Sequence, residues 1–333
     1  MNSNELSPVL LLGGTGSLGG RTARMLRRLQ PDLPIALAAR NLDRARELAA
    51  ELGTATVTSV DLERADLGFD ESTRFSAVVT ALRDRSLTTM RFAQEREIPY
   101  VALSDGVFEL GPTVARHLHR PTAPILLLGH SDGGVPLTVA LHFATAFRSV
   151  ESIELGLLFD PDDPFGPVSA ADLDHIERTG PRPLIVRDGG WHWAGPEITG
   201  RTFAGVDGVV HQGSAAGLQD VLGLGVAVPA KSVRIDLAEG STASSRRGDG
   251  PSHEAIIEIE GEKSDGTTGR FRYEIVDPEG YAALSARGVA VAVEHLLGLA
   301  GAPPPGPGLY FPENLVDPGY LLGKLETFGV SVS

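Results

Sequence analysis

The sequence contains no cysteine, and this single absence excludes several kinds of chemistry. Without a thiol the chain can form no disulfide, has no thiolate nucleophile and offers no cysteine ligand to zinc. Basic residues are also scarce, because 29 lysines and arginines face 43 aspartates and glutamates, giving a formal net charge of −14. Such a field repels a nucleic-acid backbone and an anionic membrane, so we expect neither as a partner.

Long hydrophobic runs are absent as well. No apolar run reaches the roughly 18 residues that a membrane helix needs, and residues 1–5 lack the basic region of a secretory signal. The 333 residues suffice for two domains of common size or for one large domain. We therefore expect a cytoplasmic protein that acts on a small-molecule substrate and can form a homodimer.

The most informative stretch is a glycine-rich turn near the N-terminus. Apolar residues 9–12 predict a buried parallel strand before it, and apolar positions 23, 25, 26 and 29 predict a helix after it. Gly14-x-Gly16-x-x-Gly19 thus lies where a dinucleotide-binding turn lies, between the first strand and the first helix. In such a turn Gly14 permits the tight bend, Gly16 lets the backbone approach a pyrophosphate, and Gly19 lets the helix pack closely.

We predict that this turn and the helix N-terminus hold the diphosphate of a dinucleotide. The predicted contact residues are Gly14, Thr15, Gly16, Ser17, Leu18 and Gly19. The alternative interpretation is a purely structural glycine turn.

Strand and helix signals alternate over about the first 130 residues. Strands are predicted at 9–12, 34–40, 54–60, 75–81, 99–104 and 125–129. This alternation predicts an α/β fold with a Rossmann-type, doubly wound parallel sheet. Between the second and third strands, Asn41 is the expected N-cap of a helix and Gly53 its C-terminal stop.

The second half of the chain has a different character. Strands are predicted at 153–159, 184–187, 232–237, 255–261 and 271–276, a mobile loop at 244–250 and a long helix at 281–299. This pattern predicts a second α+β domain with a mixed or antiparallel sheet. We expect a dinucleotide-binding domain at 1–133, a substrate or dimerisation domain at 134–304, and a tail, 305–333, that returns to the first domain.

The order of these pieces resembles the saccharopine dehydrogenase-like NAD(P)-dependent oxidoreductases. The segments that carry the resemblance are 13–20, 38–41, 60–61, 98–104, 129–136, 277–283 and 308–313. The resemblance implies a Rossmann domain, a substrate domain and hydride transfer in the cleft between them. The sequence departs from the family's pattern at Ala102, where an aspartate is common, and at Gly133, where a proline is usual.

The end of the second strand indicates which cofactor is used. An NAD site usually has an acidic residue there, whereas this chain has Ala39 followed by Arg40. A guanidinium can bind a 2′-phosphate through paired, charge-assisted hydrogen bonds, and Arg44 adds a second positive charge. We therefore predict NADP(H) as the cofactor, with Arg40, Asn41 and Arg44 at its adenosine end; alternatively, Arg40 merely faces solvent. Asp61 either contacts the adenine or caps a loop.

Reacting groups in open α/β sheets gather beyond the carboxyl ends of the strands. Thr80, Ala81, Leu82 and Ser104 lie there and are expected beside the nicotinamide. His130 is the first candidate proton donor, because histidine titrates near neutrality, and Asp132 would orient it. The alternative is that both residues cap the helix that begins at Gly133.

His192 is the second candidate acid, because Trp191 and Trp193 flank it in what is predicted to be a pocket-lining loop. The alternative is a core or interface anchor. Tyr281 and Arg201 are weaker candidates for the substrate pocket, and no metal site is expected. The predicted function is an NADPH-dependent reductase of a C=N, C=O or polarised C=C bond, with an imine most favoured. A non-catalytic NADP-binding sensor is the alternative, favoured by the departures at Ala102 and Gly133.

Overall fold

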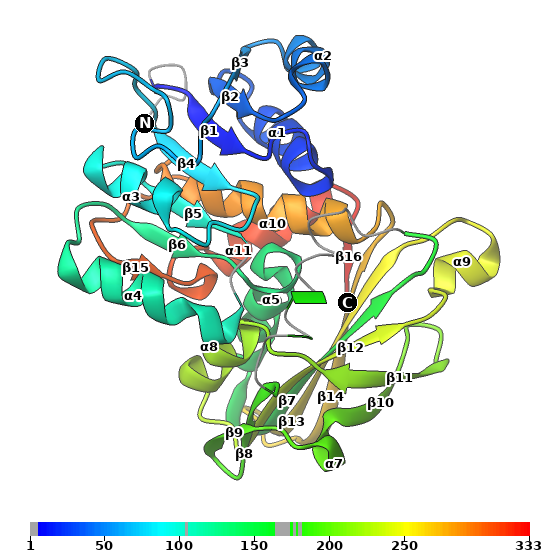
Figure 1. The fold of residues 1–333 in the computed structure, drawn as a ribbon. Coiled ribbons are helices and arrows are strands. Elements are labelled where there is room, and N and C mark those ends of the chain that lie inside the picture. The colour runs from blue at the N-terminus through cyan, green and yellow to red at the C-terminus, as the bar shows by residue number, and fades with distance from the viewer. Residues whose placement is uncertain (1–5, 104–105, 164–173, 176–177, 179–181) are drawn as a thin grey trace.

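Two β-sheets, one parallel and one mixed, organise the chain (Figure 1). The structure is a computed structural model, and it describes residues 6–103, 106–163, 174–175, 178 and 182–333. The predicted fold class, a Rossmann-type parallel sheet with a second, mixed sheet, is confirmed.

The parallel sheet has seven strands in the order β15-β6-β5-β4-β1-β2-β3. Their bounds are β1 (Val9–Leu12), β2 (Ile35–Ala38), β3 (Ala55–Thr58), β4 (Ala77–Thr80), β5 (Tyr100–Ala102), β6 (Ile125–Leu127) and β15 (Leu309–Tyr310). Strands β1, β2 and β4 are buried throughout, which explains their almost unbroken apolar sequences. The strand order reverses between β1 and β4, and this switch point is where α/β sheets bind ligands.

Helices connect these strands and cover the parallel sheet (Figure 1). They are α1 (Ser17–Leu29), α2 (Leu42–Leu52), α3 (Thr88–Glu95) and α4 (Leu110–His119), the last preceded by the 3-10 turn η2 (Val107–Glu109). Helix α2 begins and ends as predicted, because Asn41 accepts a hydrogen bond from the Arg44 amide and Gly53 adopts φ +78°.

The mixed sheet has nine strands, of which seven follow the order β10-β11-β12-β7-β13-β14-β16, while β8 pairs with β12 and β9 pairs with β8. The bounds are β7 (Phe147–Phe159), β8 (Leu184–Arg187), β9 (Gly190–Trp193), β10 (Gly200–Ala204), β11 (Val210–Ala215), β12 (Ser232–Glu239), β13 (His253–Lys263), β14 (Thr268–Asp277) and β16 (Ser331–Val332). Only the β12–β7 pair is parallel among the described strands of this sheet.

Two local predictions in this region were wrong. The segment around Trp191 is the strand β9 and not a loop. The segment predicted as a mobile loop at 244–250 contains the short helix α9 (Ala243–Arg247), whose N-cap Thr242 accepts a hydrogen bond from the Ser245 amide. The remaining short helix here is α7 (Pro196–Thr199).

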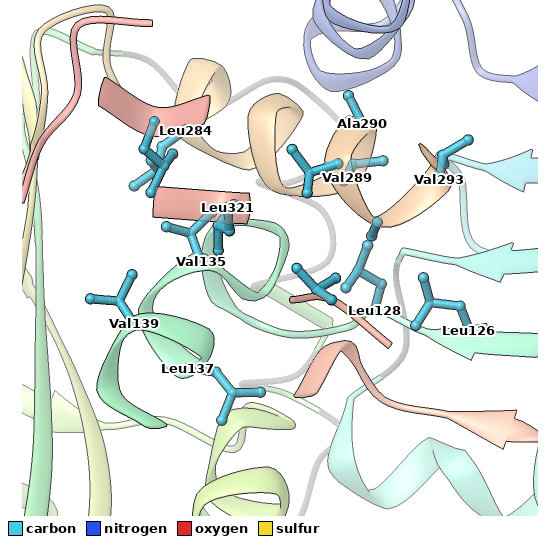
Figure 2. Packing of buried hydrophobic residues seen from close by; sticks show 14 of the residues in the cluster. Leu126, Leu128, Val135, Leu137, Val139, Leu284, Val289, Ala290, Val293 and Leu321 are labelled. Atoms are coloured by element: carbon cyan, nitrogen blue, oxygen red, sulfur yellow. The ribbon is translucent and has the colours of Figure 1, made fainter. Parts of the chain in front are cut away.

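A layer of helices joins the two sheets. It comprises α5 (Val135–Ala144), α8 (Asp220–Ala227), α10 (Tyr281–Leu296) and α11 (Pro318–Thr327), together with the 3-10 turns η3 (Ser131–Gly134) and η4 (Pro312–Asn314). Figure 2 shows Leu128, Val135, Leu284, Val289 and Leu321 converging in this layer. Because one apolar cluster extends from β1 through these helices to β7 and β13, both sheets share a core.

The last residues of the chain contact both sheets. Strand β15 pairs with β6 of the parallel sheet, and β16 pairs with β14 of the mixed sheet. None of the helices in the described part of the chain combines the length and the apolar character that crossing a bilayer requires.

Candidate functional site

A cavity of about 1320 Å³ lies at the switch point of the parallel sheet and extends to the mixed sheet. On one side it is lined by the turn between β1 and α1, and on the other by Leu157 and Phe159 of β7, Leu237 of β12, and Tyr281 at the start of α10. Ligand pockets usually measure about 300–1,000 Å³. This cavity is therefore large enough for a dinucleotide together with a small substrate.

Most of the residues predicted to contact a cofactor line this cavity. They are Thr15, Gly16, Ser17, Leu18, Gly19, Arg40, Asn41, Arg44, Ala81 and Leu82. Three others do not line it, namely Gly14, Asp61 and Thr80. Ser104 lies outside the described residues. The sequence motif thus identified one end of the cavity.

The glycine-rich turn differs in one detail from the prediction. The residue with left-handed backbone is Gly13, at φ +78°, and not Gly14. Gly19 packs as predicted, since a Cβ there would lie 2.3 Å from the Gly13 carbonyl oxygen. A Cβ at Gly16 would have one neighbour within 4 Å, the Gly13 oxygen at 3.2 Å, and Gly16 otherwise faces the cavity. The turn therefore presents backbone that a side chain would obstruct.

The N-terminus of α1 suits an anion. Its N-cap is Gly16, which supplies no side-chain hydrogen bond, and its first turn contains no acidic residue. The first amides of a helix lack intrahelical partners and carry a partial positive charge. A diphosphate placed in the cavity beside Gly16 would satisfy these amides.

Arginines surround this end of the cavity. Arg21, Arg24, Arg40 and Arg44 all line it. Arg24 is paired with Glu51, 2.6 Å from Nε to Oε1, whereas Arg21, Arg40 and Arg44 have no ion pair within the described part of the chain. Arg40 follows β2 directly and is exposed. These three guanidinium groups make this end of the cavity locally positive, although the chain as a whole has a net charge of −14.

Asp61 and Thr80 have structural roles instead. The Asp61 carboxylate accepts a hydrogen bond from the Glu63 amide at 3.0 Å and does not line the cavity, which favours the loop-capping interpretation over the adenine contact. Thr80 is 1% exposed, and its hydroxyl lies 3.3 Å from that of Thr89 beneath the sheet edge. Ala81 and Leu82 remain as cavity residues after β4.

His130 lines the cavity, but its environment does not suit a proton donor. Burial lowers the pKa of His130 to about 3, and neither ring nitrogen has a hydrogen-bond partner among the residues described. Its ring lies edge-on to that of Phe311, with 5.3 Å between centroids. A histidine with this pKa is neutral at pH 7, so the predicted role of His130 as an acid is not supported.

Asp132 does not orient His130, contrary to the prediction. Its Oδ2 lies 2.9 Å from Nε2 of His253, and both side chains are buried. The His253 ring packs against Phe159 and Tyr281, at 4.9 and 5.6 Å between centroids, and these two rings line the cavity. The Asp132–His253 pair therefore lies directly behind the cavity's aromatic residues and links the two sheets.

The backbone of the η3 turn explains one departure from the family's pattern. Asp132 and Gly133 adopt φ +47° and +63°. Proline is locked near −65° and cannot occupy such a position. A Cβ at Gly133 would also lie 2.5 Å from the Ser285 carbonyl oxygen of α10. Glycine at 133 therefore follows from close packing between this turn and α10.

A hydrogen-bonded pair that the sequence analysis missed lies beside His130. Ser131 lines the cavity, and its hydroxyl lies 2.6 Å from Oδ1 of Asp220, the first residue of α8. The Ser131 amide donates to the other carboxylate oxygen at 2.8 Å. Asp220 is fully buried, and burial raises its pKa to about 7. Burial likewise raises the pKa of Glu313 to about 7, and the Asp220 charge contributes.

The structure does not bring His192 into the cavity, and its role as an acid stays a prediction. It lies on β9, paired with Ile185 of β8, in a hairpin at the end of the mixed sheet remote from β1 and α1 (Figure 1). Neither His192 nor its neighbours line the cavity, and Trp191 and Trp193 are 46% and 49% exposed. The aromatic cluster marks an exposed hairpin, where tryptophans cover the edge of a sheet.

The two weaker candidates for the substrate pocket lie in different places in the structure. Tyr281 lines the cavity, whereas Arg201 is held outside it by Glu154, Asp236 and Glu258. No group of three metal-ligating side chains is found among the described residues.

Comparisons with known proteins place the fold. No protein-family model and no curated protein matches the sequence. Saccharopine dehydrogenase (L-Glu forming) from Saccharomyces cerevisiae matches with a TM-score of 0.66 at 14% identity, over 98% of this chain and 99% of that one. Amine dehydrogenase from Mycobacterium smegmatis matches with a TM-score of 0.56 at 14% identity, over 94% and 96%. An oxidoreductase from Agrobacterium radiobacter, in complex with NAD+, L-tartaric acid and magnesium, matches at 0.50 and 14%, over 98% and 96%.

These matches confirm the fold that the sequence resemblance implied. The chain shares with saccharopine dehydrogenase both the parallel sheet and the second sheet along nearly its full length. At these identities the likeness is one of fold, and the chemistry has to be argued from the cavity itself.

Proposed function

We propose that this protein is an NADPH-dependent oxidoreductase that transfers hydride to a C=N, C=O or polarised C=C bond of a small metabolite, an imine being most favoured. The observation that carries the proposal is the single cavity that joins the glycine-rich turn to the mixed sheet. Such a cavity lets a dinucleotide reach from the α1 N-terminus to a substrate held beneath β7 and β12. The structural neighbours, which are dehydrogenases by name, support the same class of reaction. A cytoplasmic location and a homodimer remain predictions.

The residues of the turn fit a nicotinamide dinucleotide. The amides after Gly16 would hold the diphosphate, because a side chain at Gly16 would occupy the space that it needs. Arg40 and Arg44 would bind a 2′-phosphate, since neither is engaged by a carboxylate in the described chain. Ala81 and Leu82, after β4, would lie beside the nicotinamide end.

The chemistry also needs a proton. NADPH, when bound, supplies the hydride, whose two electrons reduce the electrophilic carbon while the π pair of the double bond takes up a proton. We assign delivery of that proton to Ser131, because this residue lines the cavity and its hydroxyl bonds to Asp220 at 2.6 Å. With a pKa of about 7, Asp220 holds a proton in half of the molecules at neutral pH and can replace the one that Ser131 gives. The deprotonated Asp220 then regains a proton from solvent.

The test is a measurement of NADPH oxidation with amine–aldehyde pairs, ketones, keto acids and enones. We expect substrate-dependent loss of NADPH absorbance with the wild-type protein, and none with Gly16→Val, which blocks the turn. NADPH binding without oxidation of NADPH by any member of the panel would favour the sensor. A failure to bind NADPH would contradict the proposal altogether.

A further inference from the structure

The part of the cavity next to the mixed sheet has an apolar lining. Leu157 and Phe159 of β7, Leu237 of β12, Leu218 and Tyr281 form it, and we call this part the apolar end. Leu82 and Leu103, which follow strands of the parallel sheet, add two further apolar side chains to the lining. Among these side chains only the Tyr281 hydroxyl is polar. A ligand group placed here loses water and gains apolar contact.

Among the residues that the structure describes, the apolar end offers no available cation to a negatively charged substrate. Four of the five arginines that line the cavity belong to α1 or to the turn and helix after β2. The fifth, Arg83, forms a buried ion pair with Glu109, which also accepts from His175. His130 is neutral, because burial lowers its pKa to about 3.

The segments outside the described residues add no cation either. Residues 1–5, 104–105, 164–173, 176–177 and 179–181 contain no lysine, arginine or histidine in the sequence. The shortage of positive charge at the apolar end therefore holds for the described residues, and the remaining segments contain no side chain that would change it.

A carboxyl group adjoins the cavity instead. Asp220 lies behind Ser131, which lines the cavity, and the Asp220 carboxyl group is buried. A substrate carboxylate would lose its water, find no unpaired cation among the described lining residues and lie close to Asp220 in a medium of low polarity. Burying an unpaired charge in this way is strongly unfavourable.

We infer that the substrate carries no anionic group near the reduced bond, and that it is a ketone, imine or enone flanked by alkyl or aryl groups. The inference rests on the proposed function and narrows it. Carboxylate-bearing amino acids and keto acids are excluded as good substrates, whereas an imine is compatible, because a protonated imine is not repelled by the neighbouring carboxyl group of Asp220.

The test compares pairs of carbonyl compounds in which one member carries a carboxylate and the other is uncharged. Ethyl benzoylformate against benzoylformate, and benzylacetone against 2-oxo-4-phenylbutyrate, in which a carboxylate replaces the methyl group, are titrated into the NADP+-loaded protein and then assayed with NADPH. We expect the uncharged member of each pair to bind at least tenfold more tightly and to show the higher kcat/KM. Equal or tighter binding of the acids would overturn the inference, as would failure of every uncharged member to bind.

Leu237→Arg adds a positive charge to the apolar end, and Leu237→Met is its matched control. Leu237 is only partly buried, so both side chains can be accommodated at the cavity surface. The arginine variant should gain affinity for benzoylformate and lose its preference for the ester, while the methionine variant should keep it. The NADPH affinity of both variants should equal that of the wild type, which shows that they remain folded. Absent NADPH binding in the wild type would instead refute the proposed function, so the two failures are distinguishable.

Discussion

Arg40 is the residue whose replacement most specifically tests the cofactor assignment. It is exposed at the end of β2, lines the cavity and has no ion pair in the described chain. A hydrogen bond to a charged group contributes about 1.5–3 kcal/mol, and solvent exposure places Arg40 in the lower part of that range, near 1.5–2 kcal/mol. At about 1.4 kcal/mol for each factor of ten, Arg40→Gln should weaken NADPH binding about 10- to 30-fold.

Arg40→Asp should weaken it further, to about a hundredfold, because repulsion between the new carboxylate and a 2′-phosphate in water adds about 1 kcal/mol. NADH lacks that phosphate, so its dissociation constant should change by less than about threefold in either variant. The assay is a fluorescence titration with each dinucleotide at fixed salt, since screening weakens such contacts.

The matched control is Arg46→Asp, which makes the same charge change on α2. Arg46 pairs with Asp43 on the exposed face of the helix and does not line the cavity. Its replacement should leave both affinities unchanged. If Arg40→Asp weakened NADPH and NADH equally, the reasoning about the 2′-phosphate would be refuted.

Three further predictions concern the turn, the proton supply and the core. Gly16→Val should abolish dinucleotide binding without unfolding the protein. Unchanged binding by calorimetry would refute the assignment of the glycine-rich turn as the diphosphate site. Because the protonated Asp220 carboxyl replenishes the proton and its pKa is about 7, kcat should fall as the pH rises through 7; Asp220→Asn should lower kcat and remove that limb of the profile. An unaltered pH profile would contradict the relay. Arg287→Leu should cost about 3–5 kcal/mol in urea unfolding, because it leaves the fully buried Asp277 carboxylate unpaired, and a loss under 1 kcal/mol would contradict this.

Features that depend on local sequence could be predicted. The unbroken apolar run of β1, followed by Gly13 to Gly19 and an amphipathic helix, predicted a buried strand and a phosphate-binding turn that both occur. Asn41 was likewise recognisable as an N-cap from its position before a helical pattern. Strands β10 and β11 escaped prediction, because burial alternates in β11 but its buried positions are His211, Gly213 and Ala215, and β10 buries only Phe203, so neither has an alternating apolar pattern.

The catalytic region could not be predicted in the same way, because its contacts join residues far apart in the chain. Asp132 meets His253 across 121 residues, and Ser131 meets Asp220 across 89. Residue type alone favoured His130, whereas its pKa depends on burial that only the packed structure reveals. His192 was misplaced for the same reason, since nothing in the sequence of β9 says which end of the sheet it occupies.

The central claim is that the cavity beside Gly16 holds NADPH. A calorimetric titration of the wild-type protein with NADPH and with NADH tests it most directly. We predict saturable binding of one NADPH for each chain, about tenfold or more tighter than that of NADH. Absence of measurable binding of both dinucleotides would contradict this claim.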